Sequence, residues 1–197
     1  MPDIRQIDVI ALNFKRRLSG VTSTVIQLVP FQRKLGVRIA VLGPGLPDDA
    51  GLPKLGFAAL LGLWRPPEGR RSRIWHARRN NEMGLGLFLR GVLRMPLKLV
   101  FTSAAQRRHS AYTRFLIRRM DAVIATSDRS ASFLEVPFRV IRHGVDLDAF
   151  HPPRADEDDI AATGLPGRHL IGCFGRIRHQ KGTDLFVRAM IALLPCE

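Results

Sequence analysis

The chain has 197 residues, of which 46% are hydrophobic, so it is long enough to bury a core, and its composition excludes a disordered tail. Lysine and arginine number 31 against 17 aspartate and glutamate residues; the formal charge of +14 predicts an anionic partner such as nucleic acid, anionic lipid or a phosphorylated small molecule. The two cysteines, Cys173 and Cys196, lack the spacing of a metal site or a disulfide framework, so we expect reduced thiols and no metal.

In chain order, short apolar runs alternate with segments of helical periodicity. Strands are expected over residues 7–14, 37–43, 73–77, 98–102, 122–126 and 138–141. Helices are expected after residue 20 and over residues 55–64, 80–95 and 111–120. Pro30 lacks a backbone donor and crowds the preceding turn, so we expect it to kink the first helix or to end it early.

This alternation predicts an α/β fold in which the strands form a Rossmann-like parallel sheet. Sheets of this kind bind ligands at the carboxyl ends of their strands. We therefore expect the chemistry in the loops that follow Phe14, Ala77, Thr102 and Thr126.

A change in composition predicts a domain boundary. Between residues 151 and 168, proline, glycine and an acidic run replace the alternating pattern. We therefore expect an N-terminal domain over 1–150, a linker over 151–168 and the start of a second domain over 169–197. That start comprises one predicted strand, 169–175, and one predicted helix, 182–194, whose apolar stripe has no sheet to cover it. The second domain is therefore expected to be incomplete in this chain.

Motifs on both sides of the predicted boundary give the chain its resemblance to a known family. The segment Arg142-His143-Gly144-Val145-Asp146-Leu147-Asp148-Ala149-Phe150-His151-Pro152 is followed by Gly175-Arg176 and then by Lys181-Gly182. In this order, these segments resemble the family-four glycosyltransferases, which are retaining enzymes of the GT-B type. His143 departs from the family pattern, which has asparagine before the glycine. The resemblance implies an acceptor-side N-terminal domain followed by a nucleotide-sugar-binding domain. The family's paired glutamates lie beyond the residues given, so we expect this chain to be inactive by itself.

The resemblance implies donor-binding roles for Arg176, Lys181 and Gly20. Transfer from a nucleoside diphosphate sugar builds negative charge on the departing phosphate, which Arg176 and Lys181 would stabilise. Gly20 resembles the family's glycine loop, in which a small residue lets the backbone approach the ligands. Taken alone, the two cations are better explained as surface residues, and only their ordered combination with the other motifs favours the donor-binding role. The alternative for Gly20 is an ordinary strand-to-helix turn.

Two further segments, 73–83 and 102–110, resemble a subgroup that adds mannose to the inner core of lipopolysaccharide. The resemblance implies a GDP-mannose donor and a Kdo-bearing lipid A acceptor. His76 is the catalytic candidate, because an imidazole at a strand end is placed to bind the transferred sugar or to shuttle a proton. Arg78 and Arg79 are the acceptor-binding candidates, because a guanidinium holds a carboxylate or a phosphate. The alternative for His76 is that it only braces a loop.

No segment of the sequence is expected to cross a membrane. The N-terminus lacks the apolar stretch of a secretory signal, and the run 55–64 is about half of the ~20 residues that a bilayer requires. We expect a cytoplasmic protein that binds the inner-membrane surface peripherally, through the basic amphipathic helix 80–95. The alternative is a basic protein without catalytic activity that binds nucleic acid or an anionic membrane, a reading supported by the charge alone.

Overall fold

The structure is a computed structural model of the chain, and it describes residues 2–15, 20–44, 46, 51–148, 150–152, 164–165, 171–175, 177 and 179–193. The chain forms two compact units, Met1–Gly144 and Val145–Glu197. The division lies near the end of the predicted 1–150 domain. Most of the predicted 151–168 linker lies outside the described residues, so the predicted boundaries stay predictions.

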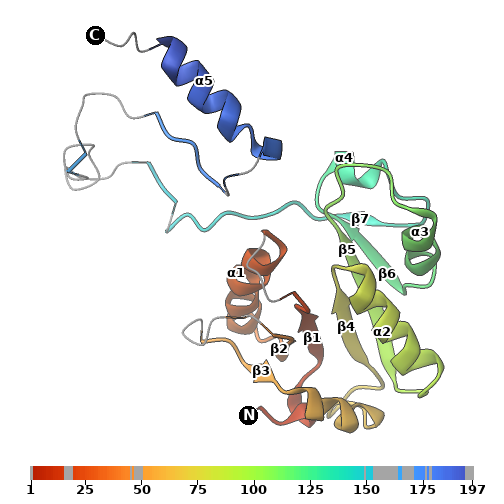
Figure 1. The fold of residues 1–197 in the computed structure, drawn as a ribbon. Coiled ribbons are helices and arrows are strands. Elements are labelled where there is room, and N and C mark those ends of the chain that lie inside the picture. The colour runs from red at the N-terminus through yellow and green to blue at the C-terminus, as the bar shows by residue number, and fades with distance from the viewer. Residues whose placement is uncertain are drawn as a thin grey trace. The chain divides into compact units, whose positions relative to one another are not determined.

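The first unit is built on a seven-stranded sheet with the order β3-β2-β1-β4-β5-β6-β7, in which every neighbouring pair is parallel (Figure 1). The strands are β1 (Val9–Leu12), β2 (Ile39–Leu42), β3 (Lys54–Leu55), β4 (Arg73–Ala77), β5 (Leu97–Ser103), β6 (Ala122–Ala125) and β7 (Arg139–Val140). This confirms the predicted α/β fold with a Rossmann-like parallel sheet.

The strand order creates a topological switch point between β1 and β4. From β1 the chain builds outward to β2 and β3, and it then crosses back to place β4 on the other side of β1. The loops that follow β1 and β4 therefore run in opposite directions and leave a crevice between them. Open parallel sheets bind their ligands at this position.

Helices cover the two faces of the sheet unequally (Figure 1). On one face, α1 buries Val25 and Val29 in a core shared with β1 and β2. On the other face a larger core surrounds Trp75 and Leu99, both fully buried, and α2 and α3 supply part of it. The helices of this unit are η1 (Ile4–Gln6), α1 (Gly20–Lys34), η3 (Phe57–Trp64), α2 (Asn80–Gly91), α3 (Ala111–Ile117) and α4 (Asp128–Ala131).

Several helices differ from their sequence-based expectation; α3, for example, ends at Ile117 instead of residue 120. Pro30 does not end α1, which continues to Lys34 because the buried Val25 and Val29 hold it against the sheet. The expected helix over 55–64 is a 3₁₀ helix, η3. α2 ends at Gly91 instead of residue 95, and Arg94 just beyond it has a φ of 54°, a left-handed conformation that no α-helix continues through.

In the second unit, η6 (His179–Lys181) leads into α5 (Thr183–Leu193), which confirms the helix predicted over 182–194. The prediction of a strand over 169–175 is wrong for its described part, because residues 171–175 form no strand. A strand is defined by hydrogen bonds to a neighbouring strand, and the described residues of this unit contain no such neighbour. Within the described residues, no helix combines the length and the apolar character that a membrane crossing requires.

Candidate functional site

A cavity of about 660 Å³ opens at the carboxyl ends of β4, β5 and β6, and all of its lining residues belong to the first unit. It lies on the face of the sheet that carries α1. That helix covers β1 and β2 but leaves the neighbouring strands less protected, and Ile74 on β4 is 37% exposed there. The cavity brings together Gly20, His76 and Arg78, three of the residues predicted to form the site.

His76 reaches the cavity because it lies on β4 with its side chain on the less covered face. Its Nε2 lies 2.7 Å from the hydroxyl oxygen of Thr102, which comes from β5. Burial, and then the positive charge of Arg78, lower the pKa of His76 to about 3. The imidazole is therefore neutral at physiological pH. It is suited to hydrogen-bonding a ligand hydroxyl and poorly suited to storing a proton near pH 7.

Arg78 follows β4 directly, and its side chain lines the same cavity. Its Nη1 is buried and has no hydrogen-bond partner, which holds for no other buried side-chain nitrogen or oxygen in the described part of the chain. Burial lowers the pKa of Arg78 to about 10, so the guanidinium stays charged at neutral pH. A buried, charged and unpaired group is costly unless an anion joins it. Position and charge therefore make Arg78 the candidate anion-binding group of this cavity.

Arg79, the other predicted acceptor ligand, is engaged within the protein. Its Nη1 donates to Glu82 Oε1 at 2.8 Å and to Asn13 Oδ1 at 3.1 Å. The side chain is 18% exposed and is not part of the cavity lining. The structure thus separates two neighbouring arginines that the sequence treated alike. A direct acceptor contact by Arg79 stays a prediction.

The predicted donor-binding residues are placed in different parts of the chain. Gly20 begins α1 and lines the cavity, and a Cβ at this position would meet no atom within 4 Å. Packing within the protein therefore does not require glycine here. Lys181 is exposed at the end of η6 in the second unit. Arg176 lies outside the described residues, so its role and that of Lys181 stay predictions.

Sequence reasoning missed three residues that organise this edge of the sheet: Asn13, Glu82 and Thr102 as the partner of His76. Asn13 and Glu82 are completely buried. Two signals were present in the sequence. Asn13 directly follows a buried strand, and Glu82 occupies the third position after the residue that precedes α2, where glutamate often accepts backbone hydrogen bonds. The pairing of Thr102 with His76 had no local signal, because 26 positions separate them.

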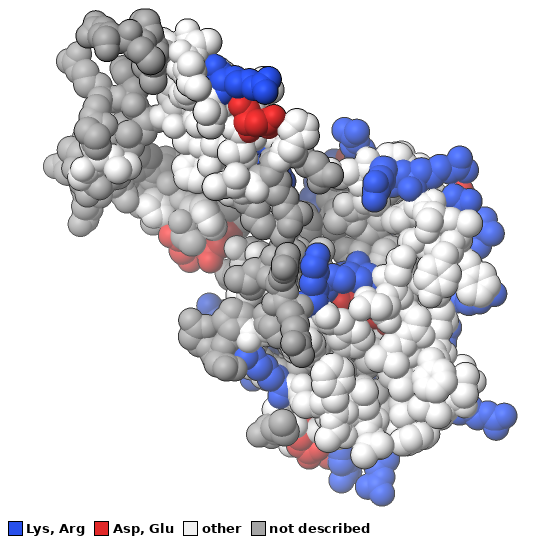
Figure 2. Space-filling model, in the orientation of Figure 1, with Lys and Arg blue, Asp and Glu red and all other residues white. Residues whose placement is uncertain are grey.

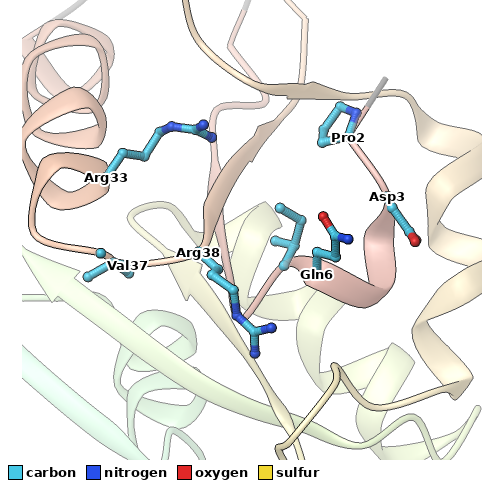
Figure 3. A pocket seen from close by; sticks show the side chains of 8 residues that line it. Pro2, Asp3, Gln6, Arg33, Val37 and Arg38 are labelled. Atoms are coloured by element: carbon cyan, nitrogen blue, oxygen red, sulfur yellow. The ribbon is translucent and has the colours of Figure 1, made fainter.

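The high net charge does not locate the site, because lysine and arginine side chains are spread over the surface (Figure 2). A smaller hollow of about 310 Å³ at the amino ends of the strands is also lined by arginines, Arg33 and Arg38 (Figure 3). There, however, Arg38 donates to both carboxylate oxygens of Asp8, at 3.0 and 2.7 Å. Because this guanidinium already has its anion, the carboxyl edge holds the stronger candidate site.

Comparisons with known proteins place the chain beside enzymes of cell-envelope synthesis. It is 75% identical over 195 residues to the lipopolysaccharide core biosynthesis mannosyltransferase LpcC of Rhizobium leguminosarum bv. viciae, covering 99% of this chain and 55% of that protein. It is 62% identical over 198 residues to the lipopolysaccharide core biosynthesis mannosyltransferase LpsB of Rhizobium meliloti, covering 100% of this chain and 56% of the relative. These findings confirm the resemblance that the motifs predicted.

A more distant relative is the D-inositol 3-phosphate glycosyltransferase of Nocardiopsis dassonvillei, 37% identical over 87 residues, which cover 40% of this chain and 20% of that protein. No family model matches the chain. The chain spans about half the length of the two curated mannosyltransferases it matches.

Proposed function

We propose that the chain is part of a glycosyltransferase of lipopolysaccharide core synthesis, which transfers mannose from GDP-mannose to a Kdo-bearing lipid A acceptor with retention of configuration. The likeness to two core mannosyltransferases along the whole chain supports the reaction class. One observation carries the site: at the carboxyl edge of the sheet, Arg78, whose buried Nη1 has no hydrogen-bond partner, shares a cavity with a neutral His76.

In this proposal, Arg78 binds the acidic group of the acceptor. A guanidinium forms parallel hydrogen bonds with a carboxylate or a phosphate, and such a ligand would give the buried Nη1 its missing partner. Arg79 is the weaker candidate for this contact, because Glu82 and Asn13 already engage its Nη1. The acceptor is therefore expected to depend on Arg78 more strongly than on Arg79.

His76 holds a hydroxyl group of the transferred sugar in this scheme. The Thr102 hydroxyl fixes one ring nitrogen, at 2.7 Å, and the charge of Arg78 favours the neutral ring. A neutral imidazole bonded in this way offers its second ring nitrogen as a hydrogen-bond partner. It adds no charge to those of Arg78 and of the acidic group of the acceptor. Its contribution is orientation of the sugar, which accelerates transfer by holding the reacting atoms in place.

The donor side of the proposal rests on the sequence resemblance. Arg176 and Lys181 are proposed to stabilise the negative charge that develops on the diphosphate as the sugar departs. Gly20 is proposed to let the donor approach the backbone at the start of α1, where amide groups and the helix dipole favour an anion. We propose that these groups supply the necessary charge and that no metal ion takes part.

The direct test is transfer of radiolabelled mannose from GDP-mannose to Kdo-bearing lipid A. Two proteins are compared: the chain alone, and the chain extended with the unmatched remainder of the Rhizobium leguminosarum relative. Transfer is expected from the extended protein and not from the chain alone, since the chain spans about half of that relative. Absence of transfer by a folded extended protein would reject the proposal, and salt-sensitive retention of DNA by the same sample would favour the nucleic-acid alternative.

The site is tested in the extended protein by two arginine substitutions. Arg78→Met is expected to lower kcat/KM by about two orders of magnitude, because it removes the positive charge and the free Nη1 donor that would bind the ligand. Arg71→Met is the matched control, since Arg71 is an exposed arginine at the amino edge of the sheet. Equal activity of the two variants would remove Arg78 from the site.

We also propose that the first unit binds the inner-membrane surface through α2 and α3. Phe88 on α2 and Tyr112 and Phe115 on α3 are 49%, 59% and 49% exposed. The guanidinium carbon of Arg119 lies 3.5 Å from the Phe115 ring centre. On the right of the view, where Figure 1 places α2 and α3, lysine and arginine side chains border a largely white surface (Figure 2). Exposed aromatic rings bordered by cations suit the interface of an anionic bilayer.

Co-sedimentation with vesicles tests this surface. The chain is expected to sediment with vesicles that contain anionic phospholipid and to stay in solution with purely zwitterionic vesicles. The double substitution Phe88→Ser and Phe115→Ser is expected to weaken sedimentation by about tenfold, because it removes two of the exposed rings. Sedimentation that is independent of lipid charge, or unchanged in the double variant, would contradict the membrane surface.

A further inference from the structure

A buried carboxylate ties together the two loops at the switch point. The carboxylate of Glu82, completely buried, accepts backbone hydrogen bonds from Phe14 at 3.3 Å, from Arg78 at 2.7 Å and from Arg79 at 3.1 Å. It also accepts the Arg79 guanidinium at 2.8 Å. Phe14 belongs to the loop after β1, and the two arginines belong to the loop after β4. One side chain thus joins the loops on the two sides of the switch point, next to the cavity that Arg78 lines.

A buried amide extends this connection to two further elements. Asn13 Nδ2 donates to the backbone carbonyls of Lys15 at 3.2 Å and Pro44 at 3.3 Å. Its Oδ1 accepts the Thr22 hydroxyl and Arg79 Nη1, each at 3.1 Å. Pro44 follows β2 and Thr22 lies in the first turn of α1. Asn13, Arg79 and Glu82, which we call the loop clamp, therefore join β1, β2, α1 and β4 at one edge of the sheet.

The loop clamp contacts two adjacent arginines in different ways. The guanidinium of Arg79 is bonded on both sides of the crevice, whereas the clamp bonds Arg78 through its backbone amide and leaves Arg78 Nη1 without a partner. Fixing the backbone of Arg78 limits where its side chain can go. The guanidinium is thereby held at the cavity, and no carboxylate among the described residues accepts a hydrogen bond from its Nη1.

Helix capping accounts for one part of this network, since Glu82 accepts the backbone amide of Arg79 at the start of α2. The buried ion pair between Arg79 and Glu82 needs a further explanation. Replacing a buried ion pair by well-packed apolar residues is often neutral or stabilising, so buried pairs are weak evidence of a stabilising role. A ligand-binding group that must be accurate to a fraction of an ångström, by contrast, requires neighbours that hold it in place. The position of the clamp at the ligand-binding edge favours the second explanation.

We propose that Glu82 and Arg79 are positioning residues, which act through Arg78 by holding its guanidinium in the cavity ready for an anionic ligand. The inference rests on the proposed function in that the anion is a group of the substrate. It assigns Arg79 an indirect role where the sequence suggested a direct contact. Loss of the clamp is therefore expected to weaken anion binding without removing any atom that touches the anion.

The test uses the chain itself, with inorganic phosphate as the anion. The dissociation constant is measured by following the side-chain Nε–Hε resonance of Arg78 in nitrogen-15 NMR spectra. In the Glu82→Gln variant the amide NH₂ opposes the donors it faces, so the dissociation constant is expected to rise by at least about tenfold. The Arg78 resonance is also expected to broaden or to split, because the guanidinium samples several positions.

Glu135→Gln is the matched control. Glu135 is a surface carboxylate that faces Arg108, Arg114 and Arg118 at 3.6, 3.7 and 3.0 Å, so the substitution removes the same charge from arginines elsewhere. It should leave the Arg78 resonance and its dissociation constant unchanged. A second clamp variant, Arg79→Lys, retains the charge but loses the planar fork, and it is expected to weaken binding by about threefold to tenfold.

The outcomes separate this inference from the proposed function. If the unmodified chain binds no phosphate at Arg78, the positioning role fails together with the anion site. If the unmodified chain binds phosphate and both folded clamp variants bind within twofold of it, the anion site stands and the positioning role is rejected. If both variants unfold, the clamp is a requirement for folding, and the positioning role is likewise rejected.

Discussion

Arg73 begins β4 and Arg78 directly follows its carboxyl end, and the two guanidinium groups differ in their hydrogen-bond partners. Arg73 is completely buried, and its Nε and Nη2 donate to the backbone carbonyls of Ile7 and Ile4, each at 2.8 Å. Arg78 is half-buried at the cavity and has a buried Nη1 without a partner. Burial lowers the pKa of both guanidinium groups.

The difference teaches how to tell a structural charge from a functional one. Arg73 ties η1 and the start of β1 to β4, so the fold itself supplies its hydrogen-bond partners. The backbone amide of Arg78 is hydrogen-bonded and its buried Nη1 is not, so a ligand that accepts from Nη1 would offset the cost of that unsatisfied donor. We therefore propose that Arg73 stabilises the protein and that Arg78 is held ready for an anion.

The largest effect is expected at Arg73. Arg73→Met leaves the Ile7 carbonyl without its Arg73 donor and removes one of the two donors to the Ile4 carbonyl, so the free energy of unfolding should fall by roughly 3 kcal/mol. Urea denaturation measures the change. Arg71→Met, at an exposed position, should fall within about 0.5 kcal/mol of the unmodified chain. Equal values for the two variants would break the comparison, because Arg73 would then have no structural role.

A glycine on α2 tests the packing behind β4, the strand that begins at Arg73 and directly precedes Arg78. A Cβ on Gly86 would lie 2.6 Å from Cδ1 of Trp75, which is fully buried, so Gly86→Ala should lower the free energy of unfolding by about 2 kcal/mol. Gly84→Ala should instead raise it by about 0.5–1 kcal/mol, since the nearest atom is 3.7 Å away and alanine favours a helix. Thermal denaturation of both variants measures these changes. Equal effects would show that α2 does not pack tightly against Trp75 on β4.

His76 gives the carboxyl edge a pH dependence that Arg73 does not have. The pKa of His76 is about 3 in the folded chain, below its ordinary value of 6.5, so the unfolded chain binds more protons between these values. Stability should therefore fall as the pH decreases through this window, by up to about 1.4 kcal/mol per pH unit from this residue. His76→Gln should show a shallower loss between about pH 6.5 and pH 4 in urea denaturation. Parallel curves for the two proteins would mean that His76 titrates normally.

The smallest effect on stability is expected at Arg78, which sharpens the contrast with Arg73. Arg78→Met removes a buried charge whose Nη1 has no partner, so the free energy of unfolding should stay within about 1 kcal/mol of the unmodified chain or rise. Urea denaturation beside Arg73→Met provides the comparison. A loss as large as that of Arg73→Met would identify Arg78 as a structural arginine.

The fold could be predicted from sequence where local patterns are strong. The strand predicted over 73–77 has the same first and last residues as β4, because polar residues bound its apolar and β-branched run. β3, with two residues, and α4, with four, are too short for any periodicity to reveal. Of the two outcomes expected at Pro30, the early end of the helix did not occur, because the packing of Val25 and Val29 holds α1 against the sheet.

The candidate site was predictable by residue type and not by partner. Strand-end positions indicated His76 and Arg78, and the cavity contains both. The sequence could not distinguish Arg79 from Arg78, because the difference depends on Asn13, which is 66 positions away from Arg79 and folds onto it from another strand. Hydrogen bonds between distant segments leave no periodic signal, so the loop clamp emerges only from the folded structure.

The most direct test of the account compares the two arginines in a single NMR spectrum. The nitrogen-15-labelled chain is titrated with inorganic phosphate while the Nε–Hε resonances of Arg73 and Arg78 are followed together. The account predicts a saturable shift of the Arg78 resonance and no shift of the Arg73 resonance. A spectrum in which Arg78 stays unchanged while exposed arginines respond would contradict the claim that its unpartnered guanidinium is an anion-binding group.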